Sequence, residues 1–212
     1  MLYLIRHAQT EWNEQNRLQG QSDLPLSPRG LEQARCVGRY FAGRPIQALY
    51  TSHLQRSAQT AEAISRTTGV TAGVDADLSE IGFGKWEGLT TEAIDAQFEG
   101  AFQRWRTAPS QVSIPGGEPL EDFRVRVRRG LAKISQRHQE EHVAVVCHGG
   151  VIGALIADWL DADYDFVIRR VALVNGGISA IDHRCDPPSI LWVNFSDHLM
   201  LPSTERTVAP VK

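Results

Sequence analysis

Two histidines each follow a short apolar run, a placement that suits phosphoryl-transfer chemistry. His7 comes after residues 2–5 and Arg6, and His148 comes directly after residues 143–147. A neutral imidazole carries a lone pair near neutral pH and can attack phosphorus without a separate base. His7 is therefore a candidate nucleophile that would carry the phosphoryl group as a phosphohistidine, although a single histidine in such a place is more often a structural hydrogen-bonding residue.

Arginine and glycine residues near these histidines could hold the phosphoryl group. Its negative oxygens must be gripped by positioned donors, and the forked guanidinium group suits them. Arg6 and Arg56 are the candidates, although an isolated arginine is more often a solvated ion-pair partner. His148 precedes Gly149 and Gly150, where helix-end amides favour an anion and a protonated imidazole would add a donor. The alternative for this motif is a tight turn with an exposed histidine.

Glu80 is the candidate proton donor. It lies in an apolar, glycine-rich segment, residues 78–84, that could hold a carboxyl group partly desolvated. Such a group can stay protonated long enough to protonate a leaving alkoxide, and could then activate water against a phosphohistidine. Taken alone, Glu80 would be interpreted as an exposed loop carboxylate. Aromatic residues farther along could line a leaving group or simply pack together: Phe83, Trp86, Phe102 and Trp105.

The elements that must position these residues alternate between strand and helix patterns. Strands are expected at 2–5, 48–51, 143–147, 178–182 and 190–195, the last two forming a closing hairpin. Residues 13–30 are expected to be irregular, and 203–212 a loose tail. One helix is expected from Pro28, capped by Ser27, to near Gly43, and another follows Ser52 as its cap and runs through Ile64. Further helices are expected over 92–105, 120–134 and 151–160. In the helix over 120–134, four arginines are expected to face outward: Arg124, Arg126, Arg128 and Arg129.

This order predicts an α/β fold, a three-layer sandwich whose mostly parallel central sheet is covered by helices on both faces. A single domain is expected over 1–202, with a small helical subdomain at about 82–118 over the site. In open α/β sheets, ligands collect outside the carboxyl ends of the strands. Arg6, His7 and His148 all fall there.

Taken together, these residues resemble the histidine phosphatase superfamily, in particular its phosphoglycerate-mutase-like branch. The branch opens with Arg-His-Gly-Glu-[Ser/Thr]-x-Trp-Asn, to which residues 6–13, Arg-His-Ala-Gln-Thr-Glu-Trp-Asn, are similar. The likeness continues in order through Gly-Gln-Ser-Asp-Leu-Pro-Leu-Ser at 20–27, Thr-Ser-His-Leu-Gln-Arg-Ser-Ala-Gln-Thr-Ala at 51–61, and His-Gly-Gly at 148–150. Ala8 and Gln9 depart from the commoner glycine and glutamate.

The resemblance implies a role for each matching residue. His7 would be the nucleophile and Glu80 the proton donor. The phosphate pocket would comprise Arg6, Arg56 and His148, with Gly149 beside it. Asn13 matches a further phosphate-contacting position, and Gln19 and Gly20 match a loop that approaches the substrate.

Within this family the sequence favours a histidine acid-type phosphatase that hydrolyses a small phosphomonoester without a metal or cofactor. In the related mutases the acid is followed by an Arg-His-Tyr-Gly-like run and a longer basic segment, whereas Glu80 is followed by Ile-Gly-Phe-Gly and the segment before Gly116 is short. A mutase must keep water from its phosphohistidine, for which this chain looks less equipped. A cofactor-dependent phosphoglycerate mutase is the alternative, and a non-enzymatic phosphate sensor or interaction module is a further one.

Composition limits the remaining functional classes. The 212 residues have a formal net charge of −3, which gives no electrostatic reason to expect nucleic-acid binding. Arg6 and His7 interrupt the first apolar run long before a membrane span could form, so a cytoplasmic protein is expected. Three cysteines without paired spacing suggest reduced thiols: Cys36, Cys147 and Cys185. A homodimer could use the closing hairpin as its edge.

Overall fold

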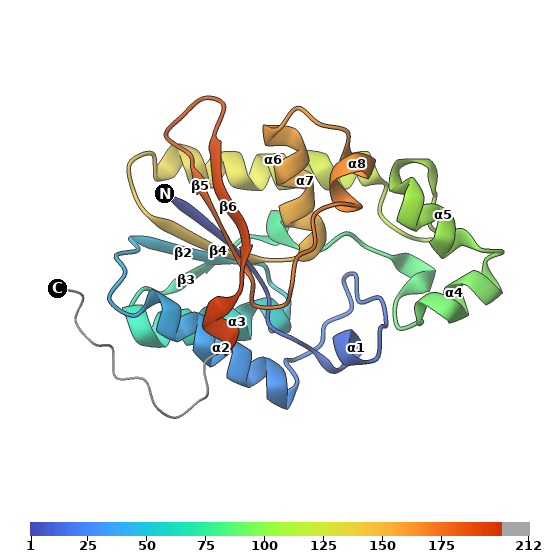
Figure 1. Cartoon of the computed structure of the whole chain (residues 1–212), viewed down its shortest axis with the longest axis horizontal. Coiled ribbons are helices and arrows are strands. Elements are labelled where there is room, and N and C mark those ends of the chain that lie inside the picture. Colours follow the sequence, from blue (N-terminus) through green and yellow to red (C-terminus); the bar gives the residue numbers. More distant parts are fainter. Residues whose placement is uncertain (201–212) are drawn as a thin grey trace.

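The computed structural model describes residues 1–200, and a six-stranded sheet runs through them in the order β3-β2-β4-β1-β5-β6 (Figure 1). The first four strands along the chain are parallel to one another, whereas β5 runs antiparallel to both of its neighbours, β1 and β6. The sheet is therefore mostly parallel, as predicted. The strands are β1 (Leu2–Arg6), β2 (Ala48–Thr51), β3 (Ala72–Val74), β4 (Val143–Cys147), β5 (Ile178–Asp182) and β6 (Ser189–Phe195).

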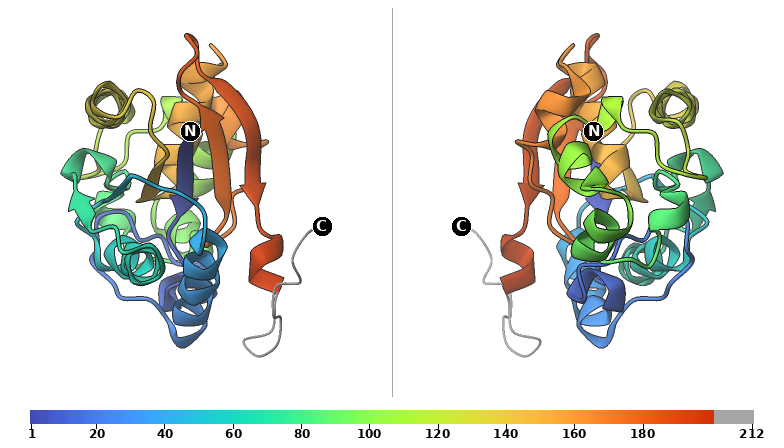
Figure 2. Two further views of the ribbon diagram at one scale, coloured as in Figure 1. Left: turned by 90° about the vertical axis from the view of Figure 1, so that its left-hand side faces the viewer. Right: turned by 90° about the vertical axis from the view of Figure 1, so that its right-hand side faces the viewer.

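Helices cover both faces of this sheet, which confirms the three-layer arrangement (Figure 2). Ser27 caps α2 as expected, because its side chain accepts a hydrogen bond from the Gly30 N–H. The helices are α1 (Glu11–Glu14), α2 (Pro28–Phe41), α3 (Gln55–Thr68), α4 (Thr91–Gln97), α5 (Ala101–Thr107), α6 (Leu120–Arg137), α7 (Gly149–Trp159) and α8 (Tyr164–Ile168).

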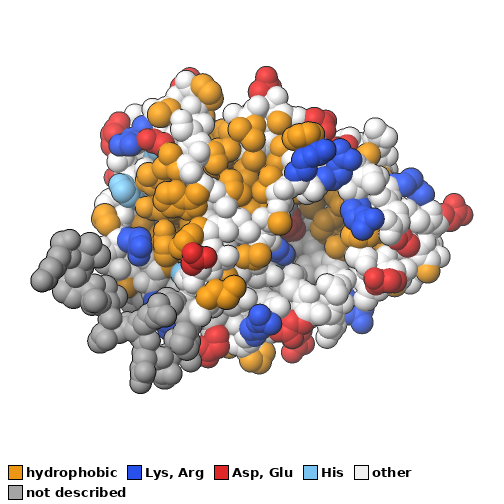
Figure 3. Space-filling model, viewed as in Figure 1, with side chains coloured by type: hydrophobic (Ala, Val, Ile, Leu, Met, Phe, Trp, Pro, Cys, Tyr) orange, Lys and Arg blue, Asp and Glu red, His pale blue; other side chains and the backbone are white. Residues whose placement is uncertain are grey.

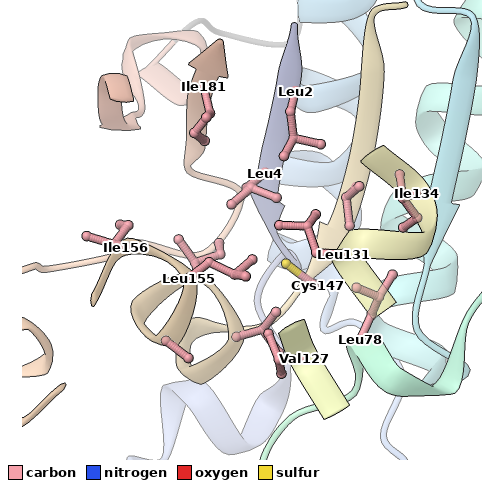
Figure 4. Close-up of a cluster of buried hydrophobic side chains, with 14 of the residues drawn as sticks. Leu2, Leu4, Leu78, Val127, Leu131, Ile134, Cys147, Leu155, Ile156 and Ile181 are labelled. Carbon is pink, nitrogen blue, oxygen red and sulfur yellow. The ribbon is translucent and has the colours of Figure 1, made fainter. Parts of the chain in front are cut away.

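Side chains of the central strands alternate between two hydrophobic cores. Tyr3 and Ile5 of β1 pack in one core with α2 and α3. Leu2 and Leu4 pack in the other with α6 and α7 (Figure 4). Because successive side chains of a strand point to opposite faces, a strand covered on both sides is apolar throughout, which explains the unbroken run at residues 2–5.

The region expected to form one helix over 92–105 is two short helices, α4 and α5. The chain between them passes through positive φ at Glu99 (51°) and Gly100 (73°), which no right-handed helix can include. Trp86 is fully buried beneath these helices with Ile94 and Ile114. Trp86 therefore belongs to the core of this helical segment, at one end of the molecule in Figure 1, and cannot line a leaving group.

Helix α3 begins later than expected, because Ser52 is not its cap. Leu54 takes the N-cap position and makes no side-chain capping bond. The first N–H of the helix, on Gln55, donates instead to Oδ1 of Asp23 at 2.7 Å. A carboxylate from the loop between α1 and α2 thus satisfies the helix end, and Ser52 is available for another contact.

Two of the four arginines on α6 do not face outward. Arg128 and Arg129 are exposed as expected, but Arg124 pairs with Asp158 of α7 at 2.6 Å, and Arg126 pairs with Glu118 at 2.6 Å. These two guanidinium groups turn away from solvent because they pair with carboxylates on neighbouring segments. The local helical pattern contains no information about those partners.

The outer strand β6 leaves one edge of the sheet unpaired within residues 1–200. Hydrophobic side chains gather over this strand on the face seen in Figure 3. Leu191 and Trp192 of β6 are exposed. The use of this hairpin as a dimer edge stays a prediction. None of the helices in the described part of the chain is long and apolar enough to cross a bilayer. The expected tail at 203–212 lies outside the described residues.

Candidate active site

The parallel strands bring the predicted site residues to one edge of the sheet. Arg6 at the end of β1 is in register with Cys147 at the end of β4, and Thr51 of β2 is in register with Val146. The next residue of each strand is therefore the start of the site. These residues are His7, Ser52 and His148, and all three are buried.

His7 is held in one orientation by its neighbours. Its backbone N–H donates to the Cys147 carbonyl at 2.9 Å, and its Nδ1 lies 2.7 Å from the Ala8 carbonyl. A carbonyl can only accept, so Nδ1 must carry the proton and Nε2 keeps the lone pair. Burial, and next the positive charges of Arg56 and Arg6, hold the pKa of His7 well below its usual 6.5. His7 is therefore neutral at pH 7.

Arg56 enters the site from the first turn of α3 and is fully buried. Its Nη1 donates to the Ser22 carbonyl at 2.8 Å, and its Nη2 to the Gly20 carbonyl at 2.6 Å. Burial lowers the pKa of Arg56 to about 10, so the side chain stays cationic at neutral pH. Arg6 donates through Nη1 to the Leu173 carbonyl, and burial lowers its pKa as well.

His148 is held by Ser52, which sequence reasoning had assigned to a helix cap. The Ser52 Oγ lies 2.8 Å from Nε2 of His148, and the same Oγ accepts from the Leu54 N–H at 3.4 Å. Burial, then the charge of Arg56, lowers the pKa of His148 well below 6.5, so the protonated form proposed from the sequence is disfavoured. If Ser52 donates to Nε2, a neutral His148 still presents Nδ1–H as a donor.

Three buried donor atoms around His7 have no hydrogen-bond partner among residues 1–200. They are Nε of Arg6, Nε of Arg56 and Nδ1 of His148. Buried polar atoms are nearly always paired, so this group of orphans marks a place where a ligand would complete the bonding. The imidazole rings of His7 and His148 lie 5.2 Å apart, and both feel the charges of the two arginines. A compact anion suits such a site.

Glu80 reaches this edge from the segment after β3. Its Oε1 accepts from its neighbour Ile81 N–H at 2.9 Å, and its Oε2 accepts from the Gly150 N–H at 3.1 Å. Gly150 lies in the first turn of α7, where any side chain would collide: a Cβ there would lie 2.3 Å from Oε1. The second glycine of the His-Gly-Gly motif is thus needed to admit the carboxyl group.

The other residues predicted for the site make different contacts around His7. Asn13 and Gln19 accept hydrogen bonds from Thr10, through Asn13 Oδ1 at 3.1 Å and Gln19 Oε1 at 2.9 Å. Gly20 contributes its carbonyl to Arg56. A Cβ on Gly149 would lie 3.6 Å from Nε of Arg6, so this glycine borders the anion space. Gln19 is buried and braces the loop.

Two more residues of the site were missed from the sequence. Asn175 donates from Nδ2 to the His7 carbonyl at 3.1 Å and to Asn13 Oδ1 at 3.2 Å. Glu87 accepts from the Gln21 N–H at 3.0 Å and from the Phe83 N–H at 2.9 Å, which ties the substrate loop to the helical segment. Asn175 precedes two glycines, a weak turn signal, and nothing local distinguishes Glu87.

Donor groups suited to a metal do not gather anywhere in the part of the chain that the structure describes. No set of three or more His, Cys, Asp or Glu side chains there has the spacing to hold an ion. The site itself presents cationic groups and neutral imidazoles, whereas Mg²⁺ and Ca²⁺ take oxygen ligands.

Comparison with known proteins agrees with this arrangement. The family model for the histidine phosphatase superfamily (branch 1) matches residues 2–196, which include every site residue described above. The chain belongs to this superfamily. The match includes His7 after β1 and the His-Gly-Gly motif after β4.

Relatives of this histidine phosphatase include both activities weighed from the sequence. "Putative phosphoserine phosphatase 2" of Hydrogenobacter thermophilus is 31% identical over 93% of this chain and 96% of its own length. "Probable phosphoglycerate mutase GpmB" of Salmonella choleraesuis is 33% identical over 86% of this chain and 85% of its own. The structure of a mycobacterial glucosyl-3-phosphoglycerate phosphatase with VO3 is 30% identical, with a TM-score of 0.84 over 92% of this chain and 99% of that one.

Proposed function

We propose that this histidine phosphatase is a phosphomonoesterase that hydrolyses a small phosphorylated metabolite through a phosphohistidine on His7, without a metal. The observation that carries the proposal is a set of three buried donors, without partners among residues 1–200, around a neutral, oriented imidazole. A phosphoryl group would pair with Nε of Arg6, Nε of Arg56 and Nδ1 of His148. Those donors would strengthen their hold as charge shifts onto its oxygens.

The first chemical step transfers the phosphoryl group to the enzyme. Nε2 of His7 attacks phosphorus, and the bond from phosphorus to the substrate oxygen breaks. The imidazole becomes positively charged as the new bond forms, and the Ala8 carbonyl at Nδ1 stabilises that charge. Glu80, protonated at this stage, gives its proton to the leaving oxygen.

The second step returns the enzyme to its starting state. Glu80, now a carboxylate, accepts a proton from a water molecule as that water attacks the phosphohistidine. The N–P bond breaks, inorganic phosphate leaves, and His7 recovers its lone pair while Glu80 is protonated again. The hydrogen bond from the Gly150 N–H to Oε2 holds the carboxyl group through both steps.

Phosphate release in excess chelator tests this proposal. The native chain should release inorganic phosphate from at least one phosphomonoester in a panel of phosphoserine, sugar phosphates and ribazole phosphate. His7→Asn should lose turnover, whereas His142→Asn, which alters a part-buried histidine just before β4, should keep it. Quenching the native enzyme with labelled substrate in alkaline denaturant, where the acid-labile N–P bond survives, should trap label on His7. A chelator-sensitive reaction, or full activity of His7→Asn, would overturn the mechanism.

Phosphoglycerate mutase activity is the second candidate, because the Salmonella protein named as a mutase is about as similar as the relative named as a phosphatase. A mutase would isomerise phosphoglycerate, would depend on a bisphosphorylated primer and would release little phosphate. A short segment with few basic residues before Gly116 favours hydrolysis over this outcome. Measuring isomer formation and phosphate release in the same reaction separates the two.

A further inference from the structure

Arg126 of α6 makes an unusually complete set of hydrogen bonds directly behind Glu80. Its Nε and Nη2 form a forked pair with Glu118, at 2.6 and 2.8 Å. Its Nη1 donates to the carbonyls of Asp77 and Ser79, at 2.9 and 2.7 Å, and Nη2 donates to the Glu80 carbonyl at 2.8 Å. A guanidinium group has five N–H donors, and each of them is used.

These contacts fix the backbone on both sides of Glu80. The segment before it is held by the carbonyl contacts, and the segment after it by Glu118, whose Oε2 accepts from the Gly82 N–H at 3.1 Å and whose own N–H donates to the Gly82 carbonyl at 2.8 Å. The Glu80 backbone and carboxyl group are therefore held from opposite sides, by Arg126 and by the Gly150 N–H.

Arg126 is not placed to bind the phosphoryl group itself. Its donors are all paired, and its side chain is only 14% exposed. It differs in this from Arg6 and Arg56, which each keep a buried Nε without a partner among residues 1–200. Arg126 can affect the reaction through the groups that it holds and through its charge, which also helps to lower the pKa of His148. Arg126→Lys keeps that charge and so isolates the first of these effects.

We propose that Arg126 is a positioning residue for the proton donor, holding the Glu80 carboxyl group at the distance that leaving-group protonation requires. The proposal rests on the proposed function, in which Glu80 protonates the leaving oxygen. Lysine could keep the charge at this position, but it cannot make the forked pair and three carbonyl contacts together. The proton transfer should therefore weaken in Arg126→Lys even though the variant keeps its charge.

A series of leaving groups tests this role. Alkyl phosphates need their leaving oxygen protonated, whereas p-nitrophenyl phosphate releases a stabilised anion and needs little help. General acid catalysis contributes about 100-fold or more, so Glu80→Gln should lower kcat/KM for alkyl phosphates by about 100-fold and for p-nitrophenyl phosphate far less. Arg126→Lys should show the same selective loss, at about 10-fold. kcat/KM is the right quantity because it covers only the steps through leaving-group departure.

Two further variants separate positioning from stability. Arg124→Lys removes a forked donor from the same helix, where the side chain pairs with Asp158 and is 24% exposed, and it should leave the leaving-group dependence unchanged. Glu118→Gln keeps the shape of the Arg126 partner while weakening the pair, and should give a smaller selective loss. Urea unfolding of every variant would show that the proteins compared are folded.

These measurements separate failure of the positioning role from failure of the proposed function. An equal loss for both substrate types in Arg126→Lys and Glu118→Gln, with a selective loss in Glu80→Gln, would overturn the positioning role and leave the proposed function intact. Absence of His7-dependent turnover in the native chain would instead reject the proposed function. If Arg126→Lys fails to fold, the selective loss in Glu118→Gln decides the question.

Discussion

The hydroxyl of Ser52 and Nε2 of His148 lie 2.8 Å apart, joining the carboxyl ends of β2 and β4 across the sheet. Both side chains are fully buried. This bond orients an imidazole whose other nitrogen has no partner in the described part of the chain, so Ser52 sets the direction in which that nitrogen points.

Ser52→Ala should lower kcat/KM by about 10-fold, because an unpaired buried polar nitrogen costs about 1–3 kcal/mol and His148 would lose its fixed orientation. The measurement is steady-state hydrolysis of the best substrate, together with inhibition by inorganic phosphate, which should weaken in parallel. Ser57→Ala is the matched control: Ser57 is equally buried but pairs with Thr51 and the Val146 carbonyl. Equal losses in the two variants would argue against a special role for Ser52.

The imidazole of His7 should titrate well below pH 6.5 in the ligand-free protein. Burial and two neighbouring guanidinium groups disfavour its charged form, so its lone pair stays available as the pH falls through 6.5. An NMR titration of the histidine side chains, with His7 assigned by its absence in His7→Asn, measures this directly. A His7 midpoint at or above 6.5 would contradict the electrostatic description.

His7 and His148 should make the free energy of unfolding fall as the pH is lowered from 6.5 to 4. Their pKa values are lowered in the folded state, so the unfolded chain binds protons first and stability is lost as the pH drops below the unfolded value. Each contributes a slope of up to about 1.4 kcal/mol per pH unit. Urea unfolding of the native chain and of His148→Asn across this range should show a shallower slope in the variant.

The ion-paired carboxylate of Asp77 contributes to this window only at its acidic end. The Arg129 guanidinium lowers the pKa of Asp77 to about 2, so its stabilising effect is lost only as the pH falls below the unfolded value of 3.8. An unchanged slope in His148→Asn between pH 6.5 and 4 would show that His148 does not stay neutral in the folded state.

Gly150→Ala should disable the proton donor while leaving the nucleophile in place. The new Cβ would lie 2.3 Å from Glu80 Oε1, so the carboxyl group must move, and kcat/KM for alkyl phosphates should fall by about 100-fold. Gly153→Ala, in the same helix, meets only the end of the Ile168 side chain at 2.7 Å and should be tolerated. Comparable activity in both variants would show that Glu80 does not need its present position.

Glu87→Ala should raise KM more than it lowers kcat. Glu87 ties Gln21 and Ser22 to Phe83, so its loss would loosen the loop whose Gly20 and Ser22 carbonyls hold Arg56. We expect KM to rise about 10-fold and stability to fall by about 1 kcal/mol, since the part-buried Ser22 hydroxyl and Phe83 N–H lose their acceptor. Glu92→Ala, on the exposed side of α4, is the control. A change confined to kcat would contradict this account.

Local patterns in the chain were enough to predict the elements whose side chains have the same surroundings along their whole length. The runs at 2–5 and 143–147 are apolar throughout because both faces of the central sheet are covered, and Ser27 followed by Pro28 marks a helix start through local bonding alone. The positions of Arg6, His7 and His148 followed from these strands, since parallel strands end at a common edge.

Local patterns do not reveal which polar groups meet across segments far apart in the chain; that depends on the folded arrangement. Asp23 replaces Ser52 as the cap of α3, Ser52 turns to His148, and Arg126 turns inward to Glu118 and the Glu80 backbone. Each of these hydrogen bonds depends on a partner that lies far away in the sequence. Hydrogen bonds and charge pairs act over a few ångströms in space rather than in sequence, so the support of the active site appears only once the chain is folded.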